Sequence, residues 1–503
     1  MVTYTYQPGT SDARLAVPGP RALPLIGPTG SVFRFINDSV GYASQLFRRY
    51  GPVVALCADG GTNLYSPQPD CPGTVFTYGP ELARQATTQH EVFYKYPLTL
   101  TLYRKRQDAG RYEPLKHFGV GLFGVNSDEH RQQRRLLMPA FHKKRIEAYR
   151  DDMVAITRSE LDQWQMGHQL GLADALRFLT MRVATKTLFG RDIGEEGGEA
   201  GHLLQEALVV GASPLTTLLP FDLPGLPYRR YLDLIGRFSE QMRTIIAQKR
   251  ASGLDEGDVL SMLLRPRDEE SGVQLTEDEI LGHTGVFFAA GHETSANALT
   301  WTLLLLTQHL QVAADLLDEL DGVLHGEPPT VEQLQHLPLL DRVVKESMRV
   351  LPPAPWNARV LSQPMEFGGY TLPAGTEIFV SIYHTHHMPE IYPQPEVFDP
   401  GRWERISHSI FEYQPFSAGP RMCIGASFAI MEIKIVLAML VQRYRLQCLP
   451  RPRVDRSGLI VITPRGGLPM IVHQQDRQFT RGVGGIRGNI REMVTLPTGE
   501  NLC

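Results

Sequence analysis

The chain has 503 residues, which by length alone suggests two or three domains, and with 42% hydrophobic and 21% charged residues it has the composition of a folded globular protein rather than a disordered chain. The net charge of −4 and the scattered Lys and Arg residues argue against a nucleic-acid-binding protein. The five cysteines form no CxxC pair, so we expect neither a disulfide framework nor a zinc site, and a reducing, cytoplasmic location.

The N-terminal residues 1–30 are rich in proline. Because Pro18, Pro20 and Pro24 lie close together, this segment cannot form a regular helix and is predicted to be an arm that runs extended over the body. It contains no apolar run long enough for a signal peptide or for a membrane anchor of about 20 residues. We therefore expect a protein without a membrane anchor.

The main body is predicted to be mostly helical. Apolar residues recur at helical spacing from about residue 32 to residue 251, with short strand-like runs near Val53 and Val75. Thr276 followed by Glu279 predicts a capping box that opens a helix running to about Gln308. Such a helix would be about 48 Å long. Because it is apolar on most sides, we expect it in the centre of the fold.

The C-terminal part is predicted to mix helices with short strands. A helix is expected over residues 338–351, before two prolines, and another over residues 426–443. The alternating runs within residues 365–382 indicate a small antiparallel sheet, and residues 459–472 are again strand-like. Residues 475–503 are polar and rich in Gly and Arg, which predicts a flexible C-terminal tail.

The segment FSAGPRMCIG, residues 416–425, places Cys423 between two glycines and just before an apolar helix. At the start of a helix a thiolate is stabilised by the helix dipole and by backbone N–H groups. Gly419 and Gly425 permit the turns and the close approach that a flat ligand needs, and Phe416 can shield the sulfur from water. The alternative is a buried free cysteine in a glycine-rich turn.

The segment AGHETS, residues 290–295, places an acid and a hydroxyl in the middle of the expected central helix. Such groups are costly in a core unless they are hydrogen-bonded or used. Two interpretations are open. Thr294 can donate to the carbonyl oxygen four residues earlier while Glu293 reaches toward solvent, or the pair can take part in a reaction.

The segment FSAGPRMCIG resembles the haem-binding signature FxxGxRxCxG of the cytochrome P450 family at every fixed position. The resemblance covers about residues 18–474 and implies a soluble, bacterial-type haem-thiolate monooxygenase. It implies one mainly α domain, residues 31–474, with a small antiparallel β region and with haem b between a long central helix and the cysteine loop. Cys423 would be the axial ligand of the iron, Phe416 and Gly425 would contact the haem, and Arg421 would bind a haem propionate.

The segment AGHETS in turn resembles the family element AGx[DE]T[ST]. The resemblance implies that Ala290 and Gly291 form an oxygen-binding groove. It also implies that Thr294 hydrogen-bonds the bound oxygen and that Glu293 relays protons through water.

The pair Glu346 and Arg349 is followed by Arg402 and then by the cysteine loop, in the order that the family has. The resemblance implies that these three residues form a structural triad behind the haem, not a catalytic one. The same ExxR spacing occurs at residues 147–150 and 240–243, where a solvated ion pair is expected.

Further propionate partners are implied at His130, Arg134 and Arg359, although a plain surface role for His130 is as well supported. A local basic cluster is either a solvated face or a docking patch for an acidic ferredoxin or flavodoxin-type electron donor. Its members are Arg135, Lys143, Lys144 and Arg145.

The implied reaction inserts one atom of O2 into an apolar small molecule, by hydroxylation or epoxidation. Electrons would come from a separate ferredoxin or flavodoxin with its reductase, and the protein is expected to be a monomer. Substrate contacts are expected at Ala289, Trp356 and the segments 98–122 and 214–227. Two alternatives remain: a peroxide-dependent haem-thiolate enzyme and a non-catalytic haem-thiolate sensor or binding protein. The Glu293–Thr294 pair argues against both.

Overall fold

The computed structural model describes residues 15–24, 27–68, 70–96, 110–192, 199–211, 213, 215–216, 219–264, 272, 274–458 and 460–498, and the structural statements below concern these residues. The α-helices are α1 (Thr29–Asn37), α2 (Ser39–Tyr50), α3 (Pro80–Thr88), α5 (Glu113–Val120), α6 (Ser127–Leu137), α7 (Lys143–Ala148), α8 (Arg150–Leu161), α9 (Leu172–Phe189), α10 (Glu199–Gly211), α12 (Pro227–Ser252), α13 (Val259–Leu263), α14 (Glu277–Gln308), α15 (Leu310–Leu324), α16 (Pro338–Val350), α17 (Ile382–His386) and α18 (Ala426–Arg443). Short 3-10 helices are η1 (Met138–Phe141), η2 (Gln333–His336), η3 (Pro400–Glu404), η4 (Gly419–Arg421) and η5 (Asn489–Glu492).

The strands are β1 (Val53–Ala55), β2 (Thr74–Thr77), β3 (Phe93–Tyr94), β4 (Gln169–Gly171), β5 (Trp356–Leu361), β6 (Met365–Phe367), β7 (Tyr370–Leu372), β8 (Glu377–Ser381), β9 (Tyr444–Cys448), β10 (Arg456–Ser457), β11 (Thr463–Pro464) and β12 (Pro469–Gln474). Five of them form a sheet in the order β1-β2-β8-β5-β3, in which β2 and β8 are parallel and the other neighbours antiparallel. The prediction of one small antiparallel sheet within residues 365–382 is therefore wrong in part. β6 and β7 pair as a hairpin, whereas β8 lies inside the larger, mixed sheet.

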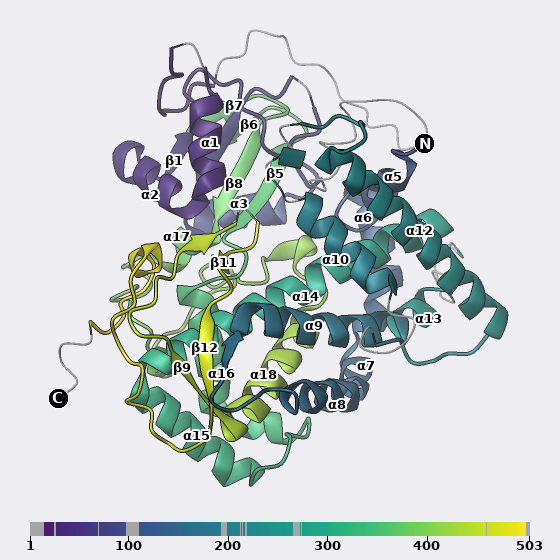
Figure 1. Cartoon of the computed structure of the whole chain (residues 1–503). Helices are drawn as coiled ribbons and strands as arrows, with labels where there is room; N and C mark the ends of the chain where they lie inside the picture. Colours follow the sequence, from purple (N-terminus) through teal and green to yellow (C-terminus); the bar gives the residue numbers. More distant parts are fainter. Residues whose placement is uncertain are drawn as a thin grey trace.

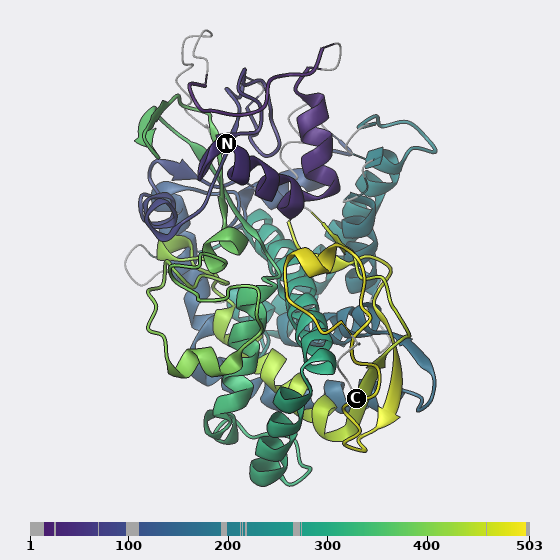
Figure 2. The same ribbon diagram turned by 90° about the vertical axis from the view of Figure 1, so that its left-hand side faces the viewer.

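The molecule is mainly α-helical, as predicted. Figure 1 shows the five-stranded sheet with α1 and α2 at one end and most of the helices at the other. The long helix α14 crosses the middle and packs against α5, α9, α16 and α18. In the perpendicular view of Figure 2, α14 again lies among the other helices. The helix α14 is therefore the centre of the helical region.

The bounds of α14 confirm the prediction from the capping box. The Thr276 side chain accepts from the backbone N–H of Glu279, and the Glu279 carboxylate accepts from the backbone N–H of Thr276 at 2.7 Å. Such a cap contributes about 1 kcal/mol and fixes where the helix begins. Most α14 side chains from Ile280 onward are buried, which explains why the sequence has no polar stripe there.

The described part of the N-terminal arm lies extended against the sheet, as predicted. The carbonyl oxygens of Pro18 and Pro20 accept hydrogen bonds from the backbone N–H groups of Ala55 and Ala58, at 2.8 Å and 2.9 Å. Leu15 and Val17 are buried. The proline-rich arm therefore extends the sheet edge formed by β1.

The prediction of a flexible tail from residue 475 onward is wrong for residues 475–498. Ile490 and Val494 are fully buried, and η5 lies in this segment. The N–H of Thr495 donates to the carbonyl oxygen of Glu396 at 2.8 Å. Gly and Arg dominate the composition, but apolar residues recur among them and pack onto the body. Figure 2 shows this segment, in yellow, lying along the helical region.

No described helix combines the length and the apolarity that crossing a membrane would require.

Candidate functional site

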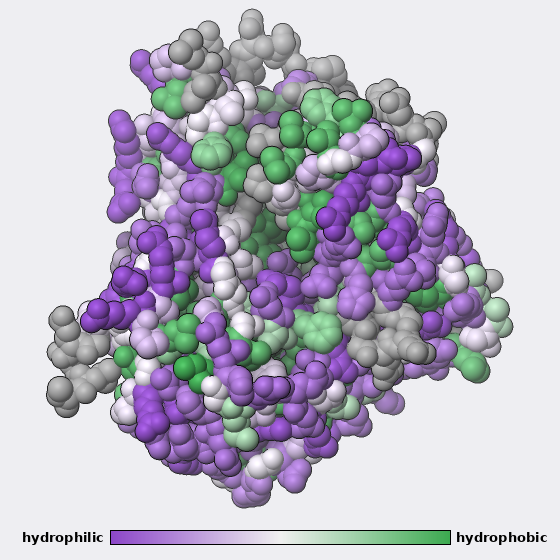
Figure 3. Space-filling model, viewed as in Figure 1, coloured by the Kyte–Doolittle hydropathy of each residue, from purple (hydrophilic) through white to green (hydrophobic). Residues whose placement is uncertain are grey.

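A mainly apolar pocket lies between α14, the cysteine loop and the start of α18. Its apolar walls come from several elements, and they include Leu122, Phe123, Phe287, Ile382, Phe416 and Phe428. Figure 3 shows one face of the molecule hollowed near its middle, with hydrophobic residues gathered in and around the hollow. No Asp or Glu is among the described residues that line the pocket.

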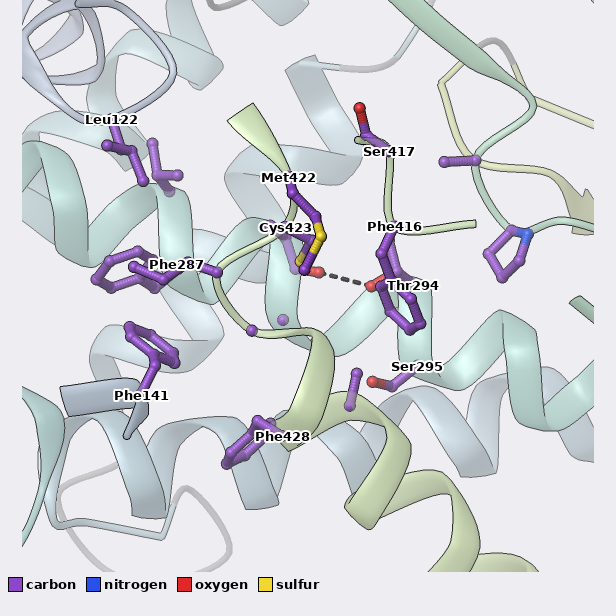
Figure 4. A pocket seen from close by; sticks show the side chains of 18 of the residues that line it. Leu122, Phe141, Phe287, Thr294, Ser295, Phe416, Ser417, Met422, Cys423 and Phe428 are labelled. Carbon is purple, nitrogen blue, oxygen red and sulfur yellow. Dashed lines mark hydrogen bonds between the residues drawn. The ribbon is translucent and has the colours of Figure 1, made fainter. Parts of the chain in front are cut away.

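One face of α14 forms a wall of this pocket. Ala290, Thr294 and Ala298 are spaced four residues apart and therefore share a face, and Gly291 lies beside them. The Thr294 hydroxyl donates to the carbonyl oxygen of Ala290 at 2.7 Å (Figure 4). This is the hydrogen bond expected if Thr294 only bonds back to its own helix. Thr294 nevertheless also lies in the pocket wall.

Glu293 is half-buried on α14 but does not line the pocket. Burial raises the pKa of its carboxyl, and the positive charge of Arg177 on α9 partly offsets this rise. Ala289, which was expected in the substrate pocket, also lies outside the lining, whereas Trp356 belongs to it.

The cysteine loop forms the wall that Figure 4 places beside Thr294. The N–H of Cys423 donates to the carbonyl oxygen of Phe416 at 2.9 Å, which closes the loop. Gly419 has a φ of +70°, and a Cβ atom there would lie 2.4 Å from the carbonyl oxygen of Thr87. Only glycine therefore fits this turn. The loop is further held by the Asn357 side chain, which donates to the Ser417 hydroxyl at 2.7 Å.

Cys423 itself lies deep in the molecule, and its exposed surface faces the pocket. Burial raises the pKa of its thiol, while the N–H of Gly425 and the positive charges of Lys95 and Arg134 lower it. Cys448, by contrast, lies in β9, with Thr307 at 3.4 Å from its sulfur, and is not part of the lining. Among the described cysteines, Cys423 is the one that meets the pocket.

Four basic side chains line the same pocket: Lys95, His130, Arg134 and Arg421. Burial, with the positive charges of Arg359 and Arg421, lowers the pKa of Lys95 to about 7. Burial, followed by the charges of Arg421 and Arg134, lowers the pKa of His130 to about 3. Burial is the largest cause of both shifts, and neighbouring cations add to it, since no carboxylate is among the described lining residues.

The Arg421 guanidinium donates to the backbone and to one side chain, but its Nε–H has no partner in the described structure. The acceptors are the carbonyl oxygens of Leu122 and Val125 and the side chain of Asn126, and the Nε–H is buried. Burial and the nearby Arg359 lower its pKa to about 9. A buried donor without an acceptor is rare and calls for an explanation, for which an acceptor on a bound ligand is one candidate.

Arg359, predicted as a further propionate partner, does not line the pocket. Its guanidinium donates to the carbonyl oxygen of Ala358 at 2.8 Å and to the Asn357 side chain, and burial lowers its pKa to about 10. It therefore lies behind the wall, close enough to Arg421 and Lys95 to add positive potential there.

Comparison with known proteins identifies the family. The family model described as Cytochrome P450 matches residues 17–469. The chain belongs to the cytochrome P450 family. It is 34% identical over 467 residues to a cyclooctat-9-en-7-ol 5-monooxygenase of Streptomyces melanosporofaciens, covering 90% of this chain and 94% of the relative. It is 30% identical over 439 residues to a pentalenene oxygenase of Streptomyces avermitilis, covering 84% of this chain and 92% of the relative.

Solved structures agree with this assignment. A retinoic-acid-bound cyanobacterial CYP120A1 superimposes with a TM-score of 0.77 at 25% sequence identity, covering 92% of this chain and all of that one. The protein therefore has the cytochrome P450 fold and is a haem-dependent monooxygenase, as the cysteine motif predicted.

The pocket itself fits haem. A haem has a flat apolar ring with two carboxylates on one edge, and this pocket joins apolar walls to a group of buried cations without an acidic partner in its described lining. The Nε–H of Arg421, which has no partner in the described structure, and the thiol of Cys423 would supply the remaining features, a propionate donor and an iron ligand.

The family scaffold is also present. The Arg349 guanidinium donates to both Glu346 oxygens, at 2.9 Å and 2.8 Å, and Arg402 Nε lies 3.2 Å from Glu346 Oε1. Glu346 and Arg349 are fully buried. The triad joins α16 to η3, and it does not line the pocket.

The two other ExxR copies differ from their prediction. Arg150 donates to the carbonyl oxygens of residues 328 and 329 instead of pairing with Glu147, and Arg243 lies 3.6 Å from Glu277 instead of pairing with Glu240. Neither copy forms the expected local ion pair in the described structure.

Lys95 and Ser295 also line the pocket, although no role for either was predicted from the sequence. Lys95 follows β3 and its ammonium lies 4.4 Å from the centre of the Phe123 ring. No motif surrounds it, so only the fold reveals its place. Residues 98–109 of the predicted substrate segment 98–122 lie outside the described residues.

Proposed function

We propose that this protein hydroxylates or epoxidises an apolar terpenoid, with Cys423 as the iron ligand of its haem. The observation that carries the proposal is that Cys423 and the α14 residues Gly291 and Thr294 line one apolar pocket, together with four basic groups. The two relatives, named for a monooxygenase acting on cyclooctat-9-en-7-ol and for a pentalenene oxygenase, support a terpenoid substrate.

Bound haem would supply the binding and cleavage of O2, which the electron-rich thiolate favours. The protein residues provide the rest. Lys95, His130, Arg134 and Arg421 would hold the carboxylates, and Phe416 and Gly425 would pack beside the ring and keep water from the sulfur. Arg359, which lies behind the pocket wall, would add positive potential near Lys95 and Arg421.

Protons would be delivered along α14. Thr294 now donates to Ala290, and turning the hydroxyl by rotation about χ1 would let it donate into the groove formed by Ala290 and Gly291. Glu293, whose pKa is raised by burial, would pass protons to Thr294 through water. Trp356 would contact the substrate from β5.

Electrons would come from a separate ferredoxin or flavodoxin with its reductase. We propose that the donor docks at the basic cluster of α6 and α7. Lys143 and Lys144 are exposed there, whereas Arg145 pairs with Asp255 at 3.0 Å. An acidic donor would be steered by such a patch. A monomeric state and a cytoplasmic location remain predictions.

The two alternatives are less well supported. A peroxide-dependent enzyme or a sensor has no need of a proton relay, whereas Glu293 and Thr294 are both present on α14. The relatives' names describe oxygenases.

The experiment that tests the proposal is turnover with a surrogate ferredoxin and its reductase, using polycyclic terpene hydrocarbons and terpene alcohols as substrates. We expect NADH consumption coupled to an oxygenated product that carries one atom of labelled O2. Product formed only with added peroxide, or no product from any terpenoid while haem binding is intact, would contradict it.

A further inference from the structure

Asn126, the residue directly before α6, is bonded to two separate segments that carry basic groups of the pocket. Its side-chain oxygen accepts from the backbone N–H of Lys95 at 2.8 Å and from the guanidinium of Arg421 at 2.6 Å. Its side-chain nitrogen donates to the carbonyl oxygen of Lys95 at 2.9 Å. One amide group therefore joins the chain that follows β3 to the cysteine loop.

The same residue begins the helix that carries the other two basic groups of the pocket lining. The backbone carbonyl oxygen of Asn126 accepts from the N–H of His130 at 3.2 Å, in the first turn of α6. Arg134 lies four residues further on and shares a helix face with His130. All four basic groups of the described lining are thus attached to Asn126, two through its side chain and two through the helix that it starts.

Asn126 occupies the N-cap position of α6, but its side chain does not cap the helix. An Asn at this position usually accepts from a backbone N–H two or three residues later, and in the described structure the Asn126 side chain accepts from none of these. The next residue, Ser127, has a φ of +50°, which residues with a Cβ atom rarely adopt. Departures from local preference of this kind are expected where side chains serve a site.

A neutral amide suits this position better than a carboxylate would. Asp has nearly the same size as Asn and caps helices equally well. A carboxylate beside Arg421, however, would neutralise the guanidinium and repel the carboxylates of a haem. The amide oxygen of Asn126 orients the guanidinium and leaves its positive charge for a ligand.

We propose that Asn126 is the positioning residue of the haem carboxylate site, because it holds Lys95 and Arg421 beside each other and ties both to the start of α6. The proposal rests on the proposed role of these basic groups as partners of the haem carboxylates. Asn126 is not part of the pocket lining, so it acts through Lys95 and Arg421 and not by contact with the haem.

Two substitutions separate positioning from helix capping. Asn126→Ser keeps a good N-cap residue but is too short to bridge Lys95 and Arg421, and Asn126→Asp keeps both the size and the capping group. If Asn126 only capped α6, both variants would resemble wild type. We expect instead that each variant transfers its haem to apomyoglobin about tenfold faster than wild type. Asn126→Asp should also lower the reduction potential of the haem, because the added negative charge favours the ferric form.

Amide hydrogen exchange of the haem-loaded protein tests the contact itself, without turnover. The backbone N–H of Lys95 donates to the Asn126 side chain, so it should exchange about tenfold faster in Asn126→Ser. In Asn126→Asp an oxygen acceptor remains, and exchange at Lys95 should stay closer to that of wild type.

The matched control is Asn489→Ser. The Asn489 side-chain oxygen also accepts a backbone N–H from a distant segment, that of Arg456 at 2.7 Å, but Asn489 lies outside the pocket lining. This variant loses the same chemical group and should keep the wild-type rate of haem transfer and the wild-type reduction potential.

The outcomes separate this proposal from the proposed function. Wild-type haem transfer and reduction potential in both Asn126 variants would overturn the positioning role, even if exchange at Lys95 became faster, because Asn126 would then serve the fold alone. Arg421→Met tests the site on which the proposal rests and should transfer haem at least as fast as Asn126→Ser. Unchanged haem transfer in Arg421→Met would contradict the carboxylate site itself, and the positioning role would fall with it.

Discussion

At the scale of single residues, Lys95 shows how strongly this pocket favours a negatively charged occupant. Its ammonium lines an apolar wall beside Phe123 and shares the pocket with Arg134 and Arg421. Burial and the nearby cations lower its pKa to about 7, far below the usual value of lysine. The carboxylates of a haem would reverse this shift.

We predict a pH dependence for the stability of the haem-free protein. Between about pH 7 and about pH 10 the unfolded chain binds the Lys95 proton and the folded chain does not, so stability should rise with pH through this window. Lys95→Met should remove that rise, and it should weaken haem retention by about tenfold or more. Denaturant unfolding at several pH values and haem transfer to apomyoglobin measure the two effects.

The exposed Lys144→Met is the matched control and should keep the wild-type dependence on pH. If Lys95→Met keeps the same slope as wild type, Lys95 is charged in the folded protein, and its assignment to the carboxylates loses its physical basis.

The residues of the site differ in how far the sequence reveals them. Cys423 and Thr294 lie in motifs that resemble those of the family, and both line the pocket. Arg359 and Ala289, predicted to contact the haem propionates and the substrate, lie outside the pocket wall, because the direction of a side chain depends on tertiary packing. Lys95 has an ordinary local sequence, and only its surroundings in the fold give it a role.

At the scale of elements, the sequence predicted helix ends correctly where it carries a strong local signal, such as a capping box or a pair of prolines. The capping box gave the start of α14, and the prolines at residues 352 and 353 gave the end of α16. The C-terminal segment was misjudged because Gly and Arg dominate its composition. The apolar residues that anchor it are Ile486, Ile490, Met493, Val494 and Leu496. The family match ends at residue 469, before this anchored segment.

We predict that this segment contributes to the stability of the whole domain. Ile490 is fully buried, and Ile490→Ala should lower the free energy of unfolding by about 2–5 kcal/mol. Denaturant unfolding of the haem-free protein measures this. The exposed Arg481→Ala, in the same segment, should change stability by less than about 0.5 kcal/mol. Equal stability of Ile490→Ala and wild type would mean that the segment is a dispensable tail after all.

At the scale of the whole molecule, the fold brings two distant parts of the chain to one pocket. The α14 element and the cysteine loop are separated by more than a hundred residues in sequence, and Asn357 of the sheet donates to Ser417 of the loop. The basic cluster on α7 lies elsewhere on the surface, where a donor protein can reach it.

We predict that this cluster sets the rate of electron delivery. Reversing both Lys143 and Lys144 to Glu should slow reduction by an acidic ferredoxin at low salt, and the difference from wild type should shrink as salt screens the charges. Stopped-flow reduction kinetics measure it. Reversing Arg48 and Arg49, an exposed basic pair on α2, is the control. Equal slowing by both pairs of substitutions would show that net charge alone affects the rate of reduction. It would contradict a docking site at Lys143 and Lys144.

The central claim is that Cys423 holds the haem iron, and its most direct test is the carbon monoxide difference spectrum of the dithionite-reduced protein. We expect a strongly red-shifted Soret band in wild type and in Cys448→Ala, because Cys448 lies away from the pocket. The band should be lost in Cys423→Ala. A band that survives in Cys423→Ala, or one that disappears in Cys448→Ala, would contradict the assignment of the iron ligand and every role derived from it.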